Sequence, residues 1–396
     1  MSNNREVVVL SAVRTAVGTY GGALKDKTPA QLGVAVTKEA LSRSKVDISK
    51  DIDQVVFAHI IHTEGRDMYM GRVIAVESGL PIETPGYTLN RLCGSGLEAI
   101  INASNYILLG EADATVGGGT ECMSRGNYWL PTMRWGQRMW DGQVIDAVVA
   151  ALSDPFEGTH MGVTAENVAE KWGISREDQD ALAVESHRRA AAATEQGRFK
   201  DQIVPIELKT RKGTVIFDKD EHIRPDASIE GMAKLKPVFK KDGSVTAGNA
   251  SGVNDGAAAL VLMERSVAEQ KGLKPLARLV AYSHAAVDPK YMGIGPTPAI
   301  QKLLAKTGKS IQDIDVFEIN EAFASPMLAV ARDLGLPMDK VNPNGSGISL
   351  GHPVGATGAI ISVKLIHELQ RTSGRYGIAA MCIGGGQGIA AMFERL

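Results

Sequence analysis

Hydrophobic and polar positions follow the same order in two distant parts of the chain. An apolar run leads into Cys93, apolar residues then recur at helical spacing over about 95–109, and the apolar segment ADATVGGGTECM (112–123) follows. Near the C-terminus, GHPVGATGAIISVKLIHEL (351–369) reads as a turn and helix, followed by YGIAAMCIGGGQGIAAMFE (376–394). Each copy predicts a helix that leads into a strand broken at three glycines. This recurrence indicates a duplicated α/β fold with helices packed on a sheet.

The middle of the chain interrupts this pattern. Over 123–249 it contains Trp129, Trp135 and Trp140, followed by a polar helix that starts at Ser175, with Asp178 three residues later as in a capping box. The α/β pattern resumes near residue 251. We therefore expect an inserted domain over 123–249, an N-terminal half over 1–122 that is completed by about 250–274, and a C-terminal half over 275–396.

Composition narrows the class of protein. The 43 basic and 45 acidic residues give a net charge of -2, without runs of like charge, which argues against a nucleic-acid partner. Three cysteines are too few and too scattered for a disulfide framework or a zinc site. The sequence shows no signal-peptide layout and no apolar run near the roughly 18 residues of a membrane span. We expect a cytoplasmic enzyme without a metal and without membrane contact.

Cys93 is the first candidate for chemistry, because it lies where a strand gives way to a helix. A lone cysteine is more often a buried structural residue. A helix N-terminus, however, favours the thiolate and offers backbone N–H groups to an oxyanion. Gly94 and Gly96 are expected to leave the approach to the sulfur open. The nucleophile needs a base, and His352, between a glycine and a proline on a predicted turn, is the best candidate.

Two further polar residues lie where strands are expected to end, which is where α/β sites gather. Cys382 precedes three glycines, and a hairpin there would leave the N–H of Gly384 free. Asn320 follows the apolar strand IDVFEI (314–319). The histidines without such surroundings are interpreted as surface or core residues: His59, His62, His187, His222, His284 and His367.

Four motifs carry a family resemblance. NRLCGSG around Cys93, NEAF from Asn320, GHPVGATGA around His352 and CIGGGQG around Cys382 have the order and spacing of the thiolase family, which the whole chain resembles. The similarity is closest to bacterial biosynthetic β-ketothiolases (acetyl-CoA acetyltransferases), including the broad-range type that accepts propionyl-CoA. One departure is Ser346 in NPNGSGIS, where the family usually has glycine, in the turn before His352.

The resemblance implies two βαβαβαββ halves in five layers, α/β/α/β/α, with a loop domain inserted in the first half. It also implies a reversible, ping-pong Claisen condensation of two acetyl-CoA to acetoacetyl-CoA plus CoA. Cys93 would carry the acyl group, His352 would take its proton, and Cys382 would move the α-carbon proton. The N–H groups of Cys93 and Gly384 would hold one oxyanion, and His352 with a water on Asn320 the other. Coenzyme A thioesters are the implied substrates, with no prosthetic group and no metal.

The inserted segment is implied to bind coenzyme A and to form homotetramer contacts. Ser251 would form a hydrogen bond with a pantetheine amide, and Arg224 would lie at the nucleotide end. Where the family has a further serine contact after Arg224, this chain has Gly231. An ordinary core role fits three of the expected tunnel residues equally well, namely Met161, Met292 and Phe323. A core role is also open for the tryptophans of the loop LPTMRWGQRMWDG (130–142). The expected pantetheine and acyl tunnel comprises Leu152, His160, Met161, Phe239, Ala247, Met292 and Phe323.

Other functions fit the sequence less well. A thiolase that mainly degrades longer 3-ketoacyl-CoA chains uses the same residues and remains an alternative. A decarboxylating ketoacyl synthase would need a second histidine where Asn320 stands, and a non-catalytic acyl-CoA-binding relative would not need Cys93, His352 and Cys382 together. A dinucleotide-binding dehydrogenase is disfavoured because no G-x-G-x-x-G motif follows the first strand.

Overall fold

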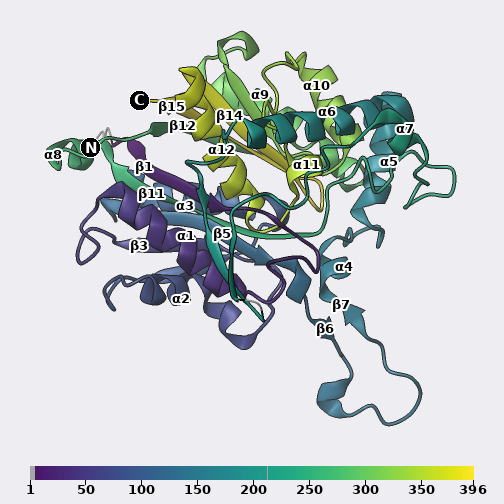
Figure 1. Ribbon diagram of the computed structural model, residues 1–396, viewed down its shortest axis with the longest axis horizontal. Helices are drawn as coiled ribbons and strands as arrows, with labels where there is room; N and C mark the ends of the chain where they lie inside the picture. The colour runs from purple at the N-terminus through teal and green to yellow at the C-terminus, as the bar shows by residue number, and fades with distance from the viewer. Residues whose placement is uncertain (1–4, 212) are drawn as a thin grey trace.

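The computed structural model describes residues 5–211 and 213–396, and a large mixed sheet organises this part of the chain (Figure 1). The main path of the sheet runs β13-β14-β15-β12-β1-β11-β5-β3-β4. Its two halves meet where β1 and β12 pair through only two residues each, Val8 with Arg278 and Val9 with Ala277. The strands on this path are β1 (Val7–Thr15), β3 (Gln54–Ala58), β4 (Gly86–Leu89), β5 (Ala114–Cys122), β11 (Asn254–Glu264), β12 (Ala277–Ala286), β13 (Val316–Ile319), β14 (Tyr376–Ile383) and β15 (Gln387–Arg395).

The helices of the two halves follow the strands in the same order, which supports the internal duplication. Helices α1, α2 and α3 alternate with the strands of the first half as α9, α10 and α12 do in the second. The helix expected over 95–109 is confirmed as α3. The helices are α1 (Pro29–Ser44), α2 (Met70–Glu77), α3 (Ser95–Leu109), α9 (Pro296–Thr307), α10 (Ala324–Leu334) and α12 (Thr357–Thr372).

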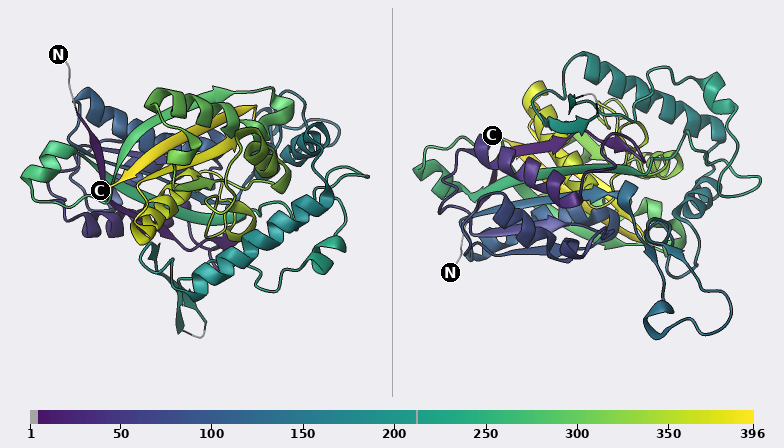
Figure 2. Two further views of the ribbon diagram at one scale, coloured as in Figure 1. Left: turned by 90° about the horizontal axis from the view of Figure 1, so that it is seen from above. Right: turned by 60° about the horizontal axis from the view of Figure 1, so that its bottom comes forward.

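The helices and sheet form five layers. Helices α3 and α12 lie together in the middle, where Leu97 and Ile100 of α3 share one core with Ala359 and Val363 of α12 and with residues of both half-sheets. A second core joins α1 and α2 to the outer face of the first half-sheet, and a third joins α9 and α10 to the outer face of the second. Figures 1 and 2 show this stacking. The expected α/β/α/β/α arrangement is confirmed.

The two glycine triplets have different structures, which corrects one prediction. Strand β5 runs unbroken through Gly117–Gly119, although a break was expected there. A Cβ at Gly117 would meet the Cα of Ile100 at 2.9 Å, so glycine lets α3 lie close to the strand. The second triplet, Gly384–Gly386, does end a strand and forms the hairpin between β14 and β15.

The segment between β5 and β11 adds further helices and strands to the two halves. Ser175 caps α6 by accepting a hydrogen bond from the N–H of Asp178 at 3.0 Å. An arm over 130–142 projects beyond the main body (Figure 1), and its Trp135 and Trp140 are 84% and 89% exposed, so a core role for these two is wrong. The elements here are β6 (Tyr128–Trp129), β7 (Ile145–Asp146), α4 (Ala147–Ala151), α5 (Met161–Trp172), α6 (Arg176–Glu195), β8 (Ile203–Val204), β9 (Ile206–Thr210), β10 (Gly213–Phe217) and α7 (Ile229–Ala233).

Candidate active site

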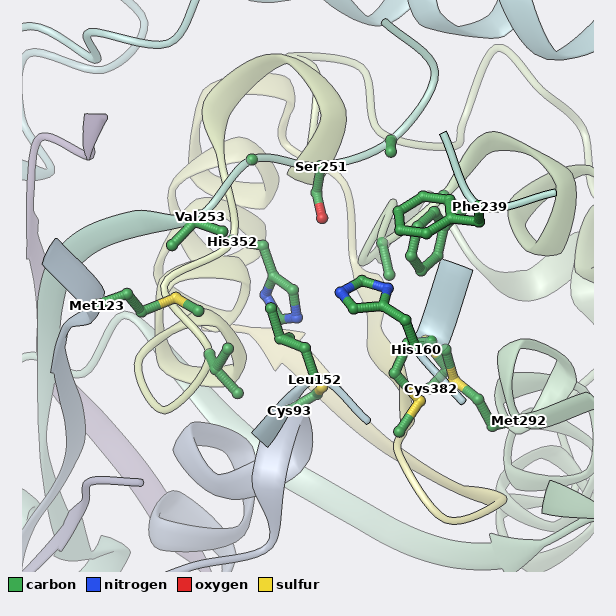
Figure 3. Close-up of a pocket in the computed structure, with 16 residues that line it drawn as sticks. Cys93, Met123, Leu152, His160, Phe239, Ser251, Val253, Met292, His352 and Cys382 are labelled. Atoms are coloured by element: carbon green, nitrogen blue, oxygen red, sulfur yellow. The ribbon is translucent and has the colours of Figure 1, made fainter. Parts of the chain in front are cut away.

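A cavity of about 220 Å³ brings together residues from both halves of the fold and from the inserted segment. Figure 3 shows the side chains of this cavity, with the two imidazole rings of His160 and His352 facing one another. The lining is mostly apolar, with thiol, imidazole and hydroxyl groups among the apolar side chains. The cavity contains ten of the residues singled out in the sequence: Cys93, Leu152, His160, Met161, Phe239, Ser251, Met292, Phe323, His352 and Cys382.

Cys93 lies in a single 3-10 turn, Leu92–Gly94, immediately before α3. The hydroxyl of Ser95 accepts a hydrogen bond from the N–H of Arg91 at 2.6 Å and closes this turn. Burial raises the pKa of the Cys93 thiol, while hydrogen bonds from the backbone N–H groups of Gly384 and of Cys93 itself lower it. The net direction of the pKa shift is upward, which favours the thiol, whereas the helix N-terminus was expected to favour the thiolate. Desolvation outweighs the helix N-terminus here.

The glycines beside Cys93 have a packing role rather than the expected one of opening a path to the sulfur. A Cβ at Gly94 would lie 2.5 Å from Cδ1 of Ile383, and a Cβ at Gly96 would lie 2.6 Å from the backbone nitrogen of Ala359. Both glycines therefore let the start of α3 press against β14 and α12. This close packing holds the Cys93 turn against the elements that lead to Cys382 and follow His352.

His352 lies in the loop between α11 (Gly347–Leu350) and α12. Its backbone N–H donates to the amide oxygen of Asn254 at 2.9 Å, and Gly351 before it has a φ of +106°, a conformation that favours glycine. The ring contacts Thr357 through Nδ1 at 2.6 Å and Asn320 through Nε2 at 3.5 Å. Burial lowers the pKa of His352 to about 4, so its imidazole is neutral at neutral pH.

Cys382 and Asn320 both lie at strand ends, as expected. Cys382 precedes the last residue of β14, and burial, followed by the repulsion that a second thiolate beside Cys93 would meet, raises the pKa of its thiol. Asn320 follows β13 and is buried beside His352. Gly384 begins the expected hairpin, where a Cβ would lie 2.8 Å from the terminal carbon of Met161. The hairpin therefore closes against the inserted segment as well as against the Cys93 turn.

The inserted segment supplies the facing wall of the cavity. His160 caps α5, with its Nδ1 accepting a hydrogen bond from the N–H of Gly162 at 3.1 Å. Its ring stacks on Phe239 with centroids 4.7 Å apart, and Phe239 in turn meets Phe323 edge to face. Burial lowers the pKa of His160. Because Nδ1 accepts, the neutral ring has its proton on Nε2, where it is available for donation.

Arg224 and Ala247 do not line this cavity but a second hollow of about 340 Å³. Ala247 was expected in the tunnel, and the chain from Ala247 to Gly252 leads from the second hollow to the cavity. Gly231 also lines the hollow, and its N–H donates to the hydroxyl of Ser228 at 3.2 Å. A serine hydroxyl therefore lies beside the position where the family serine is missing.

Six residues that line the cavity were not predicted from the sequence. Three of them, Ala250, Gly252 and Ala322, are adjacent to residues that were singled out, so proximity to a motif was the available signal. Asn254 and Thr357, which hold His352, also lie near residues that were singled out, Asn254 three residues after Ser251 and Thr357 within the motif GHPVGATGA. The six missed lining residues are Met123, Ala250, Gly252, Val253, Ala322 and Val354.

The histidines interpreted as structural lie outside the cavity. His59 contacts the carbonyl of Thr120 at 3.0 Å and His367 that of Ala12 at 2.9 Å, whereas His284 pairs with Glu98. His187 and His222 line the second hollow. Over 5–211 and 213–396, no group of three or more histidine, cysteine or acidic residues is arranged to hold a metal ion, and no helix is long and apolar enough to cross a membrane.

Known proteins of one family match this chain along nearly its full length. The thiolase N-terminal domain matches residues 7–266 and the thiolase C-terminal domain matches residues 273–395. The chain is 61% identical to the beta-ketothiolase BktB of Cupriavidus necator, over 99% of this chain and 100% of that protein. The crystal structure of the Bacillus anthracis acetyl-CoA acetyltransferase is 51% identical with a TM-score of 0.97, covering 99% of each chain. Human mitochondrial 3-ketoacyl-CoA thiolase in complex with CoA is 43% identical with a TM-score of 0.96, covering 100% of this chain and 99% of that one. The chain belongs to the thiolase family of acyltransferases.

Proposed function

We propose that this enzyme is an acetyl-CoA C-acetyltransferase (β-ketothiolase) that condenses two acyl-CoA molecules reversibly to 3-ketoacyl-CoA and CoA. The observation that carries the proposal is the shared cavity of Cys93, His352 and Cys382, which supplies a nucleophile, a neutral base and a second acid/base. Relatives named beta-ketothiolase and acetyl-CoA acetyltransferase support the same activity. The reaction uses these protein groups without a prosthetic group.

In the first half-reaction, the sulfur of Cys93 attacks the carbonyl carbon of acetyl-CoA while Nε2 of His352 takes the thiol proton. The raised pKa of Cys93 and the lowered pKa of His352 favour a neutral thiol and a neutral imidazole before attack. The N–H groups of Cys93 and Gly384, which already act on the sulfur, are suited to stabilise the carbonyl oxygen. The departing CoA sulfur receives the proton back, which leaves acetyl-Cys93.

In the second half-reaction, the thiolate form of Cys382 removes a proton from the α-carbon of a second acyl-CoA and becomes a thiol, and the resulting carbanion attacks acetyl-Cys93. The enolate oxygen is stabilised by a water that Asn320 holds beside His352. The amide oxygen of Asn320 is buried and has no hydrogen-bond partner among the described residues, which suits it to hold a polar group. The new carbon–carbon bond forms as the Cys93 sulfur leaves, and Cys93 regains a proton from the thiol of Cys382, which returns to the thiolate. Thiolysis is the reverse.

Coenzyme A would enter along the inserted segment. The apolar and aromatic lining of Leu152, Met161 and Phe239, continued by Met292 and Phe323 from the C-terminal half, suits the pantetheine arm. Ser251 offers a hydroxyl there, and the Nε2–H of His160 offers a second donor. Arg224 at the second hollow supplies positive charge for the nucleotide end. This assignment makes 123–249 a coenzyme A-binding insert between the halves at 1–122, completed by about 250–274, and 275–396.

We also propose a homotetrameric, cytoplasmic enzyme. The arm over 130–142 exposes Trp135, Trp140 and Met139, an apolar surface that a second copy would cover. Three free cysteines fit a reducing compartment. Light scattering at micromolar protein tests the assembly, and a dimer there would count against a tetramer.

The activity is tested by acylation with radiolabelled acetyl-CoA in the absence of a second substrate. Label is expected on the wild type and lost in Cys93→Ala. Cys122→Ala is the matched control, because Cys122 is a buried free thiol that does not line the cavity. Label retained in Cys93→Ala would place the nucleophile elsewhere. Rates with acetoacetyl-CoA, 3-ketovaleryl-CoA and longer 3-ketoacyl-CoA distinguish the biosynthetic enzyme from a thiolase for longer chains.

A further inference from the structure

The imidazole of His352 has a hydroxyl partner on the side away from the cavity. Its Nδ1 lies 2.6 Å from Oγ1 of Thr357, the first residue of α12. Both residues are buried, Thr357 at 2% exposure and His352 at 5%, so this contact is protected from water. A short, buried contact of this kind orients the ring and restricts where its proton lies.

The hydroxyl of Thr357 has a second contact that determines the direction of the first. Oγ1 lies 2.9 Å from the backbone carbonyl oxygen of Pro353. A carbonyl oxygen only accepts, so the single hydroxyl proton is donated to Pro353. The oxygen of Thr357 is then left to accept, and Nδ1 of His352 must be the donor. This arrangement puts the imidazole proton on Nδ1 and leaves Nε2 with a lone pair.

The opposite side of the ring points to the same tautomer. Nε2 of His352 lies 3.5 Å from the amide nitrogen of Asn320, which only donates. A proton on Nε2 would face this N–H group, whereas a lone pair accepts from it. Two contacts from different elements, α12 and the end of β13, are therefore satisfied by one protonation state.

We propose that Thr357 is a positioning residue that holds His352 in the Nδ1–H tautomer, so that Nε2 is free to take the proton of Cys93. The inference rests on the proposed function of His352 as the base. When the sulfur of Cys93 attacks, its proton moves to Nε2, and the ring becomes an imidazolium with both nitrogens protonated. Nδ1–H remains on Thr357, and Nε2–H returns its proton to the departing CoA sulfur. Proton and charge balance without a further group.

A neutral hydroxyl in this position differs from the carboxylate that supports the base in a serine-protease triad. A carboxylate would stabilise the imidazolium and raise the pKa of the histidine, whereas a hydroxyl selects the tautomer without adding charge. Removing the hydroxyl of Thr357 is therefore expected to lower the acylation rate constant by less than the roughly 10⁴-fold fall in kcat known for the wrong tautomer in such a triad. A loss nearer the 10- to 100-fold seen for other orienting partners is expected, about 30-fold.

The kinetic test compares three variants in single-turnover acylation by acetyl-CoA. Thr357→Val keeps the shape and removes the hydroxyl, and we expect the acylation rate constant to fall about 10- to 100-fold with KM within about 3-fold. Thr357→Ser keeps the hydroxyl and is expected within about 3-fold of wild type. Ser362→Ala is the matched control, because Ser362 donates the same kind of bond to Gly358 one turn along α12 without touching a histidine. Equal rates for Thr357→Val and Thr357→Ser would overturn the proposal.

Neutron diffraction from wild-type crystals near pH 7 provides a readout that depends on neither activity nor the folding of a variant. Deuterium is expected on Nδ1 of His352 and absent from Nε2. Deuterium on Nε2 alone would overturn the proposal even in an active enzyme. A wild type that is not acylated by acetyl-CoA would instead refute the proposed function, whichever nitrogen carries deuterium.

Discussion

Two histidines face the cavity from opposite walls, and the local chain gives them opposite tautomers. His352 belongs to the duplicated core, where Thr357 accepts from its Nδ1 and leaves a lone pair on Nε2. His160 belongs to the inserted segment, where its Nδ1 accepts from the N–H of Gly162 and leaves a proton on Nε2. Burial lowers the pKa of both rings, so both are neutral. One ring is prepared to take a proton and the other to donate a hydrogen bond.

The two walls of the cavity have different roles: the core wall carries the reacting groups, and the inserted wall binds the ligand. The core wall contributes Cys93, His352 and Cys382, each at the end or start of a regular element whose packing fixes it. The inserted wall contributes His160 and an aromatic surface suited to a ligand arm. Substitutions on the core wall should therefore change rate constants, and substitutions on the inserted wall should change KM. Matched variants on the two walls test this division.

The largest effect is expected from His352→Asn. Asparagine cannot take the proton of Cys93, so single-turnover acylation by acetyl-CoA should fall by at least about 100-fold, the low end of the contribution of a positioned base. KM should change by less than about 3-fold because the ring is not part of the coenzyme A wall. A loss of acylation below about 10-fold would assign the base to another group.

Cys382→Ser should separate the two half-reactions. A hydroxyl is a far weaker acid than a thiol, so exchange of the α-protons of acyl-CoA with deuterated solvent should fall by at least about 100-fold. Acylation of Cys93 should retain a sizeable fraction of its rate, since Cys93 and His352 are unchanged. Cys122→Ser, a buried thiol outside the cavity, serves as control. Parallel losses of exchange and acylation would show that Cys382 is structural.

A smaller effect, on KM, is expected from His160→Asn. The asparagine oxygen can still cap α5 by accepting from Gly162, as asparagine does at many helix N-termini, but the Nε2–H donor is lost. Loss of about one hydrogen bond corresponds to a rise in KM for acetyl-CoA of about 5- to 10-fold, with kcat within about 3-fold. Steady-state kinetics measures both constants. A fall in kcat like that of His352→Asn would remove the distinction between the walls.

Periodicity predicted the alternation of helices and strands, whereas the five layers and the set of reacting groups were predicted through short motifs that resemble the thiolase family. Helix α3 and the hairpin at Gly384 were expected, and both are present. The run Gly117–Gly119 was misinterpreted as a strand break, because glycine marks either a turn or a close approach of backbones. Only the packing of Ile100 against Gly117 shows which applies.

The charge states of the site were less predictable than its residues. The position of Cys93 at a helix start favoured a thiolate, but its pKa is raised because desolvation depends on the whole surrounding fold. Thr357 lies inside the motif GHPVGATGA, yet its role emerges only from the geometry between α12 and the preceding loop. A spacing of five residues between His352 and Thr357 does not by itself indicate contact.

The smallest effect is an expected lack of change with pH. An ordinary histidine with a pKa of about 6.5 would keep only about a tenth of its neutral form at pH 5.5. The pKa of His352 is lowered to about 4, so nearly all of the base stays neutral at that pH. The acylation rate constant should therefore stay within about 2-fold between pH 7.5 and 5.5, measured by rapid quench. A 10-fold fall over this range in folded protein would show that the imidazole titrates normally.

The lowered pKa of His352 also makes the stability of the protein depend on pH, so the acylation measurement needs a control for unfolding. Between pH 6.5 and 4 the unfolded chain binds a proton at residue 352 that the folded protein does not, so the free energy of unfolding decreases as the pH falls. His187, whose pKa is also lowered to about 4, acts in the same direction. Circular dichroism at each pH separates lost structure from lost catalysis. A constant acylation rate in a protein that becomes easier to unfold is the combination expected of a base kept neutral by burial.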